Sequence, residues 1–113
     1  MDPAIHELKP ENFKREYGIL CHRIYPKEES PTPFGATWCR VEPGGSTDPH
    51  DHDEGETFFI MEGAGTMTIR GESNPVKKGD TVFIPPLSNH VLKNNSQEDE
   101  LVFLSVYWEN KQE

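Results

Sequence analysis

The sequence predicts an all-β fold for a single domain, arranged as a sandwich or a barrel. The apolar residues gather in short runs, and ten prolines and nine glycines separate these runs. Many short strands joined by tight turns have this pattern. A chain of 113 residues can bury one modest core, and nothing in its composition divides it into two parts.

The elements can be assigned in order along the chain. Residues 1–16 are expected to form an arm with one helical turn near Pro10, and residues 17–25 a first strand. Three prolines in 26–33 deny ladder hydrogen bonds, so a loop is expected there. Glycine- and asparagine-rich turns then separate the remaining strands, and a tail follows at 109–113. These strands are expected at 34–41, 56–62, 66–70, 81–84, 89–94 and 101–108.

Charge and composition exclude several classes of partner. The net charge is -9, with 11 basic residues against 20 acidic ones, whereas nucleic-acid binding requires clustered Lys and Arg. No segment approaches the roughly 20 apolar residues of a membrane span. The first residues lack the features of a signal peptide. Cys21 and Cys39 form no CxxC motif, so a cytoplasmic protein with free thiols is expected.

Three histidines and one glutamate have the spacing of a metal site. His50 and His52 are two residues apart, so both side chains would point to one face of a strand. Glu56 keeps this parity if the chain stays extended, and His90 would come from a neighbouring strand. An isolated His-x-His is often merely solvated, but these four groups together suit a divalent transition metal. We expect one ion per chain, with Zn or Fe favoured over Mn or Ni.

The spacing of these residues resembles the two motifs of the cupin superfamily. The first motif is matched at Gly44, His50, His52, Glu56 and Gly63, and the second at Gly79, Pro85, His90 and Asn94. Leu87 stands where the second motif has a glycine, and this departure affects only the expected turn, because leucine lacks the freedom of glycine to adopt a positive φ. The resemblance covers residues 34–108. It implies a double-stranded β-helix, or jelly-roll barrel, with a short N-terminal arm, and the metal ligands named above.

The barrel would enclose a small, mostly apolar cavity. If Glu56 points inward, Phe58 and Ile60 share its face of the strand. The register of residues 34–41 leaves two alternatives, Cys39 with Thr37 or Trp38 with Arg40 facing the metal. Ser105 and Tyr107 are further polar candidates from the last strand. The candidate pocket residues are Trp38, Cys39, Phe58, Ile60, Leu92 and Tyr107. Such a cavity suits a small organic ligand.

Apolar residues also occupy the opposite face of two strands. Phe59 and Met61 alternate with the expected inward residues, and the segment 101–108 is apolar on both faces. A monomer would expose these side chains, so we expect a homodimer, as is usual for cupins. The alternative is that the N-terminal arm covers part of this face.

Three functions are compatible with these features. The first is a metal-dependent enzyme whose ion acts as a Lewis acid or binds dioxygen; cupins of this size include oxygenases, isomerases and decarboxylases. The second is a module that binds a small ligand without turnover. The third follows from segments 33–39, 55–60 and 103–109, which resemble zinc cupins joined to methionyl-tRNA-synthetase-like domains that form N–N bonds in hydrazine synthesis. A closed, structural metal site remains the alternative to all three.

Overall fold

The computed structural model describes residues 5–25 and 31–109, and its regular structure there is almost entirely β. A 3-10 turn at Pro10–Asn12 precedes nine strands. These strands are β1 Lys14–Glu16, β2 Ile19–Arg23, β3 Phe34–Val41, β4 Gly55–Glu62, β5 Ala64–Ile69, β6 Glu72–Lys77, β7 Thr81–Ile84, β8 His90–Lys93 and β9 Leu101–Trp108. The predicted all-β class is confirmed. Most of the predicted proline-rich loop and of the tail lies outside the described residues.

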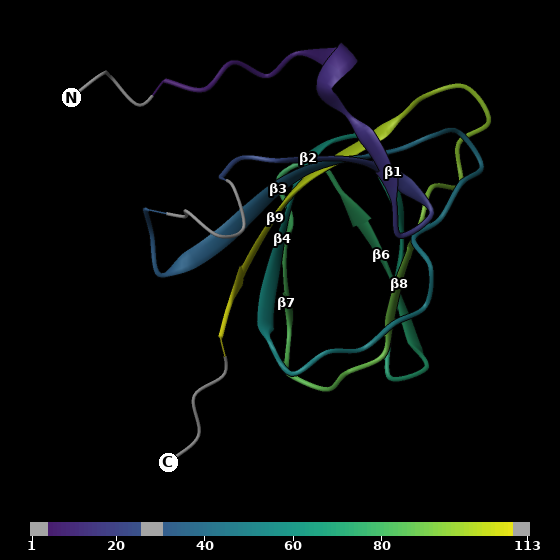
Figure 1. Ribbon diagram of the computed structural model, residues 1–113. Coiled ribbons are helices and arrows are strands. Elements are labelled where there is room, and N and C mark those ends of the chain that lie inside the picture. Colours follow the sequence, from purple (N-terminus) through teal and green to yellow (C-terminus); the bar gives the residue numbers. More distant parts are fainter. Residues whose placement is uncertain (1–4, 26–30, 110–113) are drawn as a thin grey trace.

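The strands form two antiparallel sheets that face each other as the layers of a jelly roll. The larger sheet has the order β1-β2-β3-β9-β4-β7, and the smaller has the order β6-β5-β8. Figure 1 shows β3, β9, β4 and β7 side by side in one layer, with β6 and β8 in the layer opposite. Isolated bridges pair Ser46 with Lys93 and His50 with His90, so the segment before β4 extends the smaller sheet beyond β8.

The hydrophobic core fills one end of the space between the layers. Inward residues at the end of β3 and β4 and at the start of β9 are almost fully buried, among them Val41, Ile60 and Leu101. The rings of Phe58 and Phe103 pack 4.2 Å apart. Towards the other end of the same strands the inward residues become polar or small. The functional site lies at that end.

Two elements differ from the sequence prediction. The expected strand 17–25 forms as β2, but the residues before it also form a short strand, β1, and the two make a hairpin that turns at Tyr17 and Gly18 with φ values of 54° and 78°. Two successive positive φ angles are the signature of a tight hairpin turn. Strand β6 lies between the expected strands 66–70 and 81–84, where the sequence prediction has only turns; it is polar and contains Pro75. It pairs only with β5 and lies at a sheet edge, where a missing backbone donor is tolerated.

The N-terminal arm covers only one part of the outer face of the larger sheet. The Phe13 ring lies 5.8 Å from the His22 ring and 5.0 Å from the Arg40 guanidinium, over β2 and β3. On β4 and β7, Phe59 and Phe83 stay 38% and 56% exposed. Among the described residues, no helix has the length and apolarity needed to cross a membrane.

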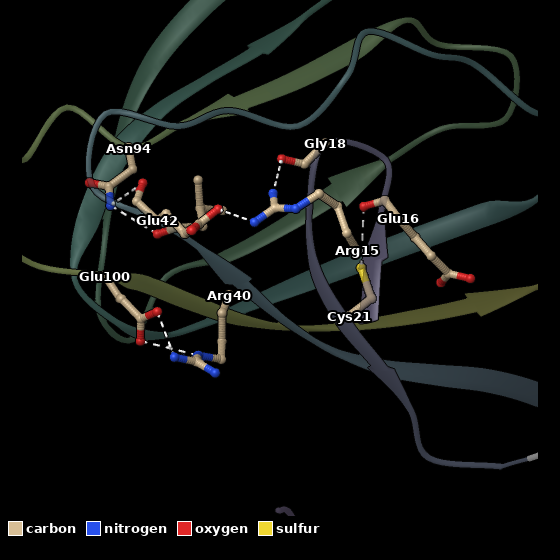
Figure 2. A network of polar contacts seen from close by, with 9 residues as sticks. Arg15, Glu16, Gly18, Cys21, Arg40, Glu42, Asn94 and Glu100 are labelled. Carbon is tan, nitrogen blue, oxygen red and sulfur yellow. Dashed lines mark hydrogen bonds and ion pairs between the residues drawn. The ribbon is translucent and has the colours of Figure 1, made fainter. Parts of the chain in front are cut away.

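The asparagine of the second motif closes the core end of the barrel. Its side-chain amide donates to the carbonyl of Glu42 at 3.2 Å (Figure 2). It also donates to the carbonyls of Val41 and Asp99 at 3.0 and 2.8 Å. The Asn94 carbonyl oxygen accepts from the backbone N–H of Ser96 at 3.0 Å. Asn94 is 1% exposed, so this motif residue is structural and ties the end of β8 to β3 and to the approach of β9.

Candidate metal centre

The structure brings the four predicted ligands together. One ligand atom from each of His50, His52, Glu56 and His90 lies within 4.8 Å of all the others. The geometry differs from the expected continuous strand, because β4 begins only at Gly55. The two histidines of the first motif lie instead in the connection before β4. The backbone N–H of His90 donates to the His50 carbonyl at 3.1 Å, and this bridge places their side chains together.

Backbone carbonyls orient all three imidazoles in the same way. Each Nδ1 lies at hydrogen-bond distance from a carbonyl two residues away in the sequence. The pairs are His50 with Asp48 at 2.9 Å, His52 with Glu54 at 3.2 Å and His90 with Ser88 at 2.8 Å. Because a carbonyl can only accept, each Nδ1 must carry the proton. Each Nε2 is then left with a lone pair that can bind a metal.

Glu56 is the anionic member of the cluster. Its Oε1 lies 3.0 Å from Nε2 of His52 and 3.3 Å from Nε2 of His90. Its Oε2 accepts a hydrogen bond from the Ser105 hydroxyl on the neighbouring strand β9. Ser105 therefore fixes the carboxylate so that Oε1 faces the imidazoles.

Burial and these contacts act in opposite directions on the pKa values of the cluster. Burial alone would raise the pKa of Glu56, but the contacts with His90 and Ser105 lower it below its ordinary value. Burial alone would lower the pKa of His90, but the Glu56 carboxylate and the Ser88 carbonyl raise it. Without a metal, the two groups therefore favour an ion pair, and a metal must displace the His90 proton.

The cluster fits a divalent transition metal. The His90 side chain is fully buried, and its Nε2 has no hydrogen-bond partner, because its approach to Glu56 lacks the required alignment. A buried polar atom without a partner is unfavourable unless another group, such as a metal, satisfies it. Three imidazole nitrogens and one carboxylate could together bind one ion. This donor set is compatible with several metals.

Three of the four ligands, His50, His52 and Glu56, line a cavity of about 930 Å³ that adjoins the inner face of the larger sheet. Of the predicted pocket residues, Cys39, Phe58 and Tyr107 line this cavity. Trp38, Ile60 and Leu92 do not, which corrects the prediction. Trp38 alternates with Cys39 and lies on the outer face of β3. Ile60 and Leu92 belong to the core, where they are 2% and 0% exposed.

A chain of polar groups crosses the cavity wall near the metal cluster. The Arg23 guanidinium donates to the Tyr107 hydroxyl at 3.2 Å, and this hydroxyl lies 3.1 Å from Oγ1 of Thr37. The Tyr107 ring lies across Gly35 of β3, where an added Cβ would come within 2.1 Å of the ring. The glycine therefore gives the tyrosine room to reach Arg23 on β2. Arg23 also lies 3.7 Å from the carboxylate of Glu16.

Two residues of the site, Tyr17 and Arg23, do not stand out in the sequence. Both belong to the β1–β2 hairpin, which precedes the part of the chain that resembles cupins. The Tyr17 ring stacks on the His50 ring, with centroids 5.3 Å apart and an interplanar angle of 22°. Gly18 was the available signal, since glycine accepts the positive φ of a tight hairpin turn, whereas Tyr17 is an unusual residue at such a position.

The fold is a jelly-roll barrel with a cluster of side chains that could hold a metal ion, and comparison with known proteins identifies the family. Residues 37–107 match the cupin domain, so the chain belongs to the cupin family. A solved structure of a protein from Photorhabdus luminescens is 33% identical, with a TM-score of 0.88 over 96% of this chain and 90% of that one.

Two curated relatives have informative names. An oxalate-binding protein from Thermotoga maritima is 34% identical over 68 residues, which are 59% of this chain and 55% of that protein. A 5-nitrosalicylic acid 1,2-dioxygenase from Bradyrhizobium is 28% identical over 64 residues, which are 57% of this chain and 31% of that protein. The chain spans about half the length of the first curated relatives it matches, at 44%, 41% and 55%.

Proposed function

We propose that this chain is a metal-dependent enzyme that acts on a small organic acid bound in the barrel cavity. The observation that carries this proposal is the position of the ligand cluster on the wall of a cavity of about 930 Å³. A purely structural metal site is normally closed by its four ligands, whereas a catalytic site keeps an open position. The cavity also lies within the size range of small-molecule sites.

The side chains around the cluster can hold a carboxylate-bearing molecule. The Arg23 guanidinium, the Tyr107 hydroxyl and the Thr37 hydroxyl can bind its polar end, and Phe58 supplies an apolar wall. The Arg23 charge is partly offset by Glu16, so an incoming carboxylate must compete with that side chain. A divalent ion in the cluster would supply Lewis acidity and open coordination positions.

The names of two relatives support an organic acid as the ligand. One relative is named for oxalate binding and the other for oxygenation of 5-nitrosalicylic acid. Both molecules are carboxylic acids, and the wall of this cavity carries a guanidinium and two hydroxyls. The two names describe different activities, binding and oxygenation, so we propose a class of ligand, small organic acids, and no single type of reaction.

Metal analysis followed by ligand titration tests the proposal. Elemental analysis of protein purified without added metal identifies the ion. Oxalate and salicylate are then titrated into metal-loaded and metal-free protein, and turnover is followed with and without dioxygen. We expect binding to require the metal. Tyr107→Phe keeps the ring but loses the hydroxyl, and it should weaken ligand binding about tenfold while leaving the metal content unchanged.

The possible outcomes separate the alternatives. Loss of metal from His52→Ala, with the Tyr107→Phe protein fully loaded, would support the assigned roles of both residues. Metal binding without affinity for any member of a small-acid panel would favour a structural site. Ligand binding without turnover would favour a binding module. Full metal occupancy in the His50→Ala/His52→Ala protein would refute the ligand set.

The outer face of the larger sheet favours a second copy of the chain as partner. Phe59, Met61 and Phe83 are 38%, 41% and 56% exposed on β4 and β7, and the Phe83 ring stacks on Trp108 with centroids 6.3 Å apart. Soluble monomers rarely expose so many neighbouring apolar side chains. Light scattering should give about twice the 12.9 kDa chain mass. Phe83→Asp should reduce this to a single chain, and a monomeric unmodified protein would contradict the proposal.

The narrower role beside a methionyl-tRNA-synthetase-like module stays a prediction. Zinc in the purified protein, together with co-purification of such a module, would support it. Iron in the cluster and dioxygen consumption would favour oxygenase chemistry instead.

A further inference from the structure

The two cysteines of the chain lie directly opposite each other in the larger sheet. In the antiparallel register of β2 and β3, Cys21 is the partner of Cys39. The backbone N–H of Ile24 donates to the Ala36 carbonyl at 2.8 Å, so this pair, three rungs away, is a hydrogen-bonded one. Because such pairs alternate along the ladder, Cys21 and Cys39 occupy a non-hydrogen-bonded position.

That position brings the two residues within reach of a covalent bond. Opposed Cα atoms at a non-hydrogen-bonded position are about 4.5 Å apart, which falls inside the range of about 4.4–6.8 Å spanned by disulfides. Both cysteines are free, and both side chains point to the inner face of the sheet, where they line the cavity beside the metal cluster. Neither belongs to the ligand set, so the metal proposal leaves them unused.

The local contacts distinguish the two thiols. The Cys21 sulfur donates to the Glu16 carbonyl at 3.7 Å (Figure 2), and the Cys39 sulfur donates to the Thr37 carbonyl at 3.7 Å. Interaction with Cys39 lowers the pKa of Cys21, whereas interaction with Cys21 together with burial raises the pKa of Cys39. Cys21 is therefore the better nucleophile, since the thiolate is the reactive form.

We propose that Cys21 and Cys39 form a reversible disulfide on the wall of the metal cavity, with a low-molecular-weight disulfide as oxidant. The Cys21 thiolate attacks one sulfur of the oxidant, forms a mixed disulfide and releases the first thiolate. Cys39 then loses its proton and attacks the Cys21 sulfur, which releases the second thiolate. Two protein thiols are oxidised and one small disulfide is reduced to two thiols. The new bond ties the strand carrying Arg23 to the strand carrying Thr37.

Oxidised glutathione tests this proposal independently of the metal. The folded protein is incubated with it, then unfolded in the presence of an alkylating reagent and weighed by intact-mass spectrometry. We expect both alkylatable thiols to disappear, the mass of the single chain to fall by two hydrogen atoms, and a digest to yield one cross-linked peptide pair. Reduction with dithiothreitol should restore both thiols.

Two serine variants test the order of attack. Cys39→Ser lacks the resolving thiol, so it should accumulate the glutathione adduct on Cys21. Cys21→Ser is the matched control and should react more slowly, because burial still raises the pKa of its remaining thiol when the contribution of Cys21 is gone. Persistence of two alkylatable thiols, stable glutathione adducts on the unmodified protein, or a disulfide between two chains would each overturn the proposal. The proposal would also be overturned if the Cys21–Cys39 disulfide formed more readily in denaturant than in the folded protein.

Discussion

Replacing Ser105 with Ala removes the hydroxyl that donates to Oε2 of Glu56 and leaves all four predicted ligands in place. A hydrogen bond to a buried charged group contributes about 1.5–3 kcal/mol. Glu56 stays ionised with and without metal, because its lowered pKa keeps it charged near neutral pH. Both states lose the bond, so metal affinity falls only by the amount by which the bond is stronger in the metal-bound protein than in the metal-free protein. Metal-free protein should unfold about 1 kcal/mol more easily, and metal affinity should fall about tenfold.

The metal affinity is measured by competition with a chromophoric chelator, and the stability by urea unfolding of the metal-free protein. Thr37→Ala is the matched control, because Thr37 lines the same cavity and contacts the Tyr107 hydroxyl but no proposed ligand. This control should keep the metal affinity of the unmodified protein. A Ser105→Ala protein with unchanged metal affinity, or a Thr37→Ala protein with an equal loss, would refute the reasoning.

Three further predictions concern pH, the motif asparagine and the motif leucine. Because the pKa of His90 is raised in the folded protein, protonation of His90 stabilises metal-free protein fully below about pH 6.5, and this stabilisation is lost as the pH rises through the pKa of the folded state. Metal binding needs the neutral ring, so the increase in melting temperature on adding zinc should grow with pH. Asn94→Ala leaves the buried carbonyl of Val41 and the partly buried carbonyl of Asp99 without this donor, and should lower the free energy of unfolding by about 2–3 kcal/mol in urea, with metal affinity retained. Leu87 has φ 62° and is 68% exposed, so Leu87→Gly should relieve roughly 1–2 kcal/mol of left-handed strain against about 0.5–1 kcal/mol of added chain entropy; a loss of stability beyond about 1 kcal/mol would contradict this.

The ligand set could be predicted because its spacing is a property of the sequence alone. The path of the backbone could not, since parity arguments assume a continuous strand. His50 and His52 have the same parity, but they lie before β4 and are aligned by pairing with β8. The register of β3 was undecidable for a related reason. Both of its faces are largely apolar or small, with Cys39 inside and Trp38 outside, so hydrophobicity did not distinguish them.

The strands that the sequence failed to predict, β1 and β6, lack an apolar face of their own. Strand β6 carries one buried residue, Val76, and pairs at an edge, so neither periodicity nor composition marks it. The β1–β2 hairpin is short, and its position depends on contacts with distant segments. The backbone N–H of Asp48 donates to the Tyr17 carbonyl at 2.8 Å, which connects the turn to the loop that holds His50. Long-range contacts of this kind have no local signal.

The same long-range contacts explain how the site can be formed before any metal binds. The loop that carries His50 and His52 is held by the bridge to His90 and by the Leu87 N–H, which donates to the His52 carbonyl at 2.6 Å. The leucine adopts the left-handed conformation that the family motif assigns to glycine, so the substitution keeps this contact at the cost of local strain. Because backbone carbonyls hold every Nδ1, the three Nε2 atoms converge without help from the ion. Metal removal should therefore lower stability without dispersing the ligands, and rebinding should be limited by deprotonation of His90 rather than by refolding of the loop.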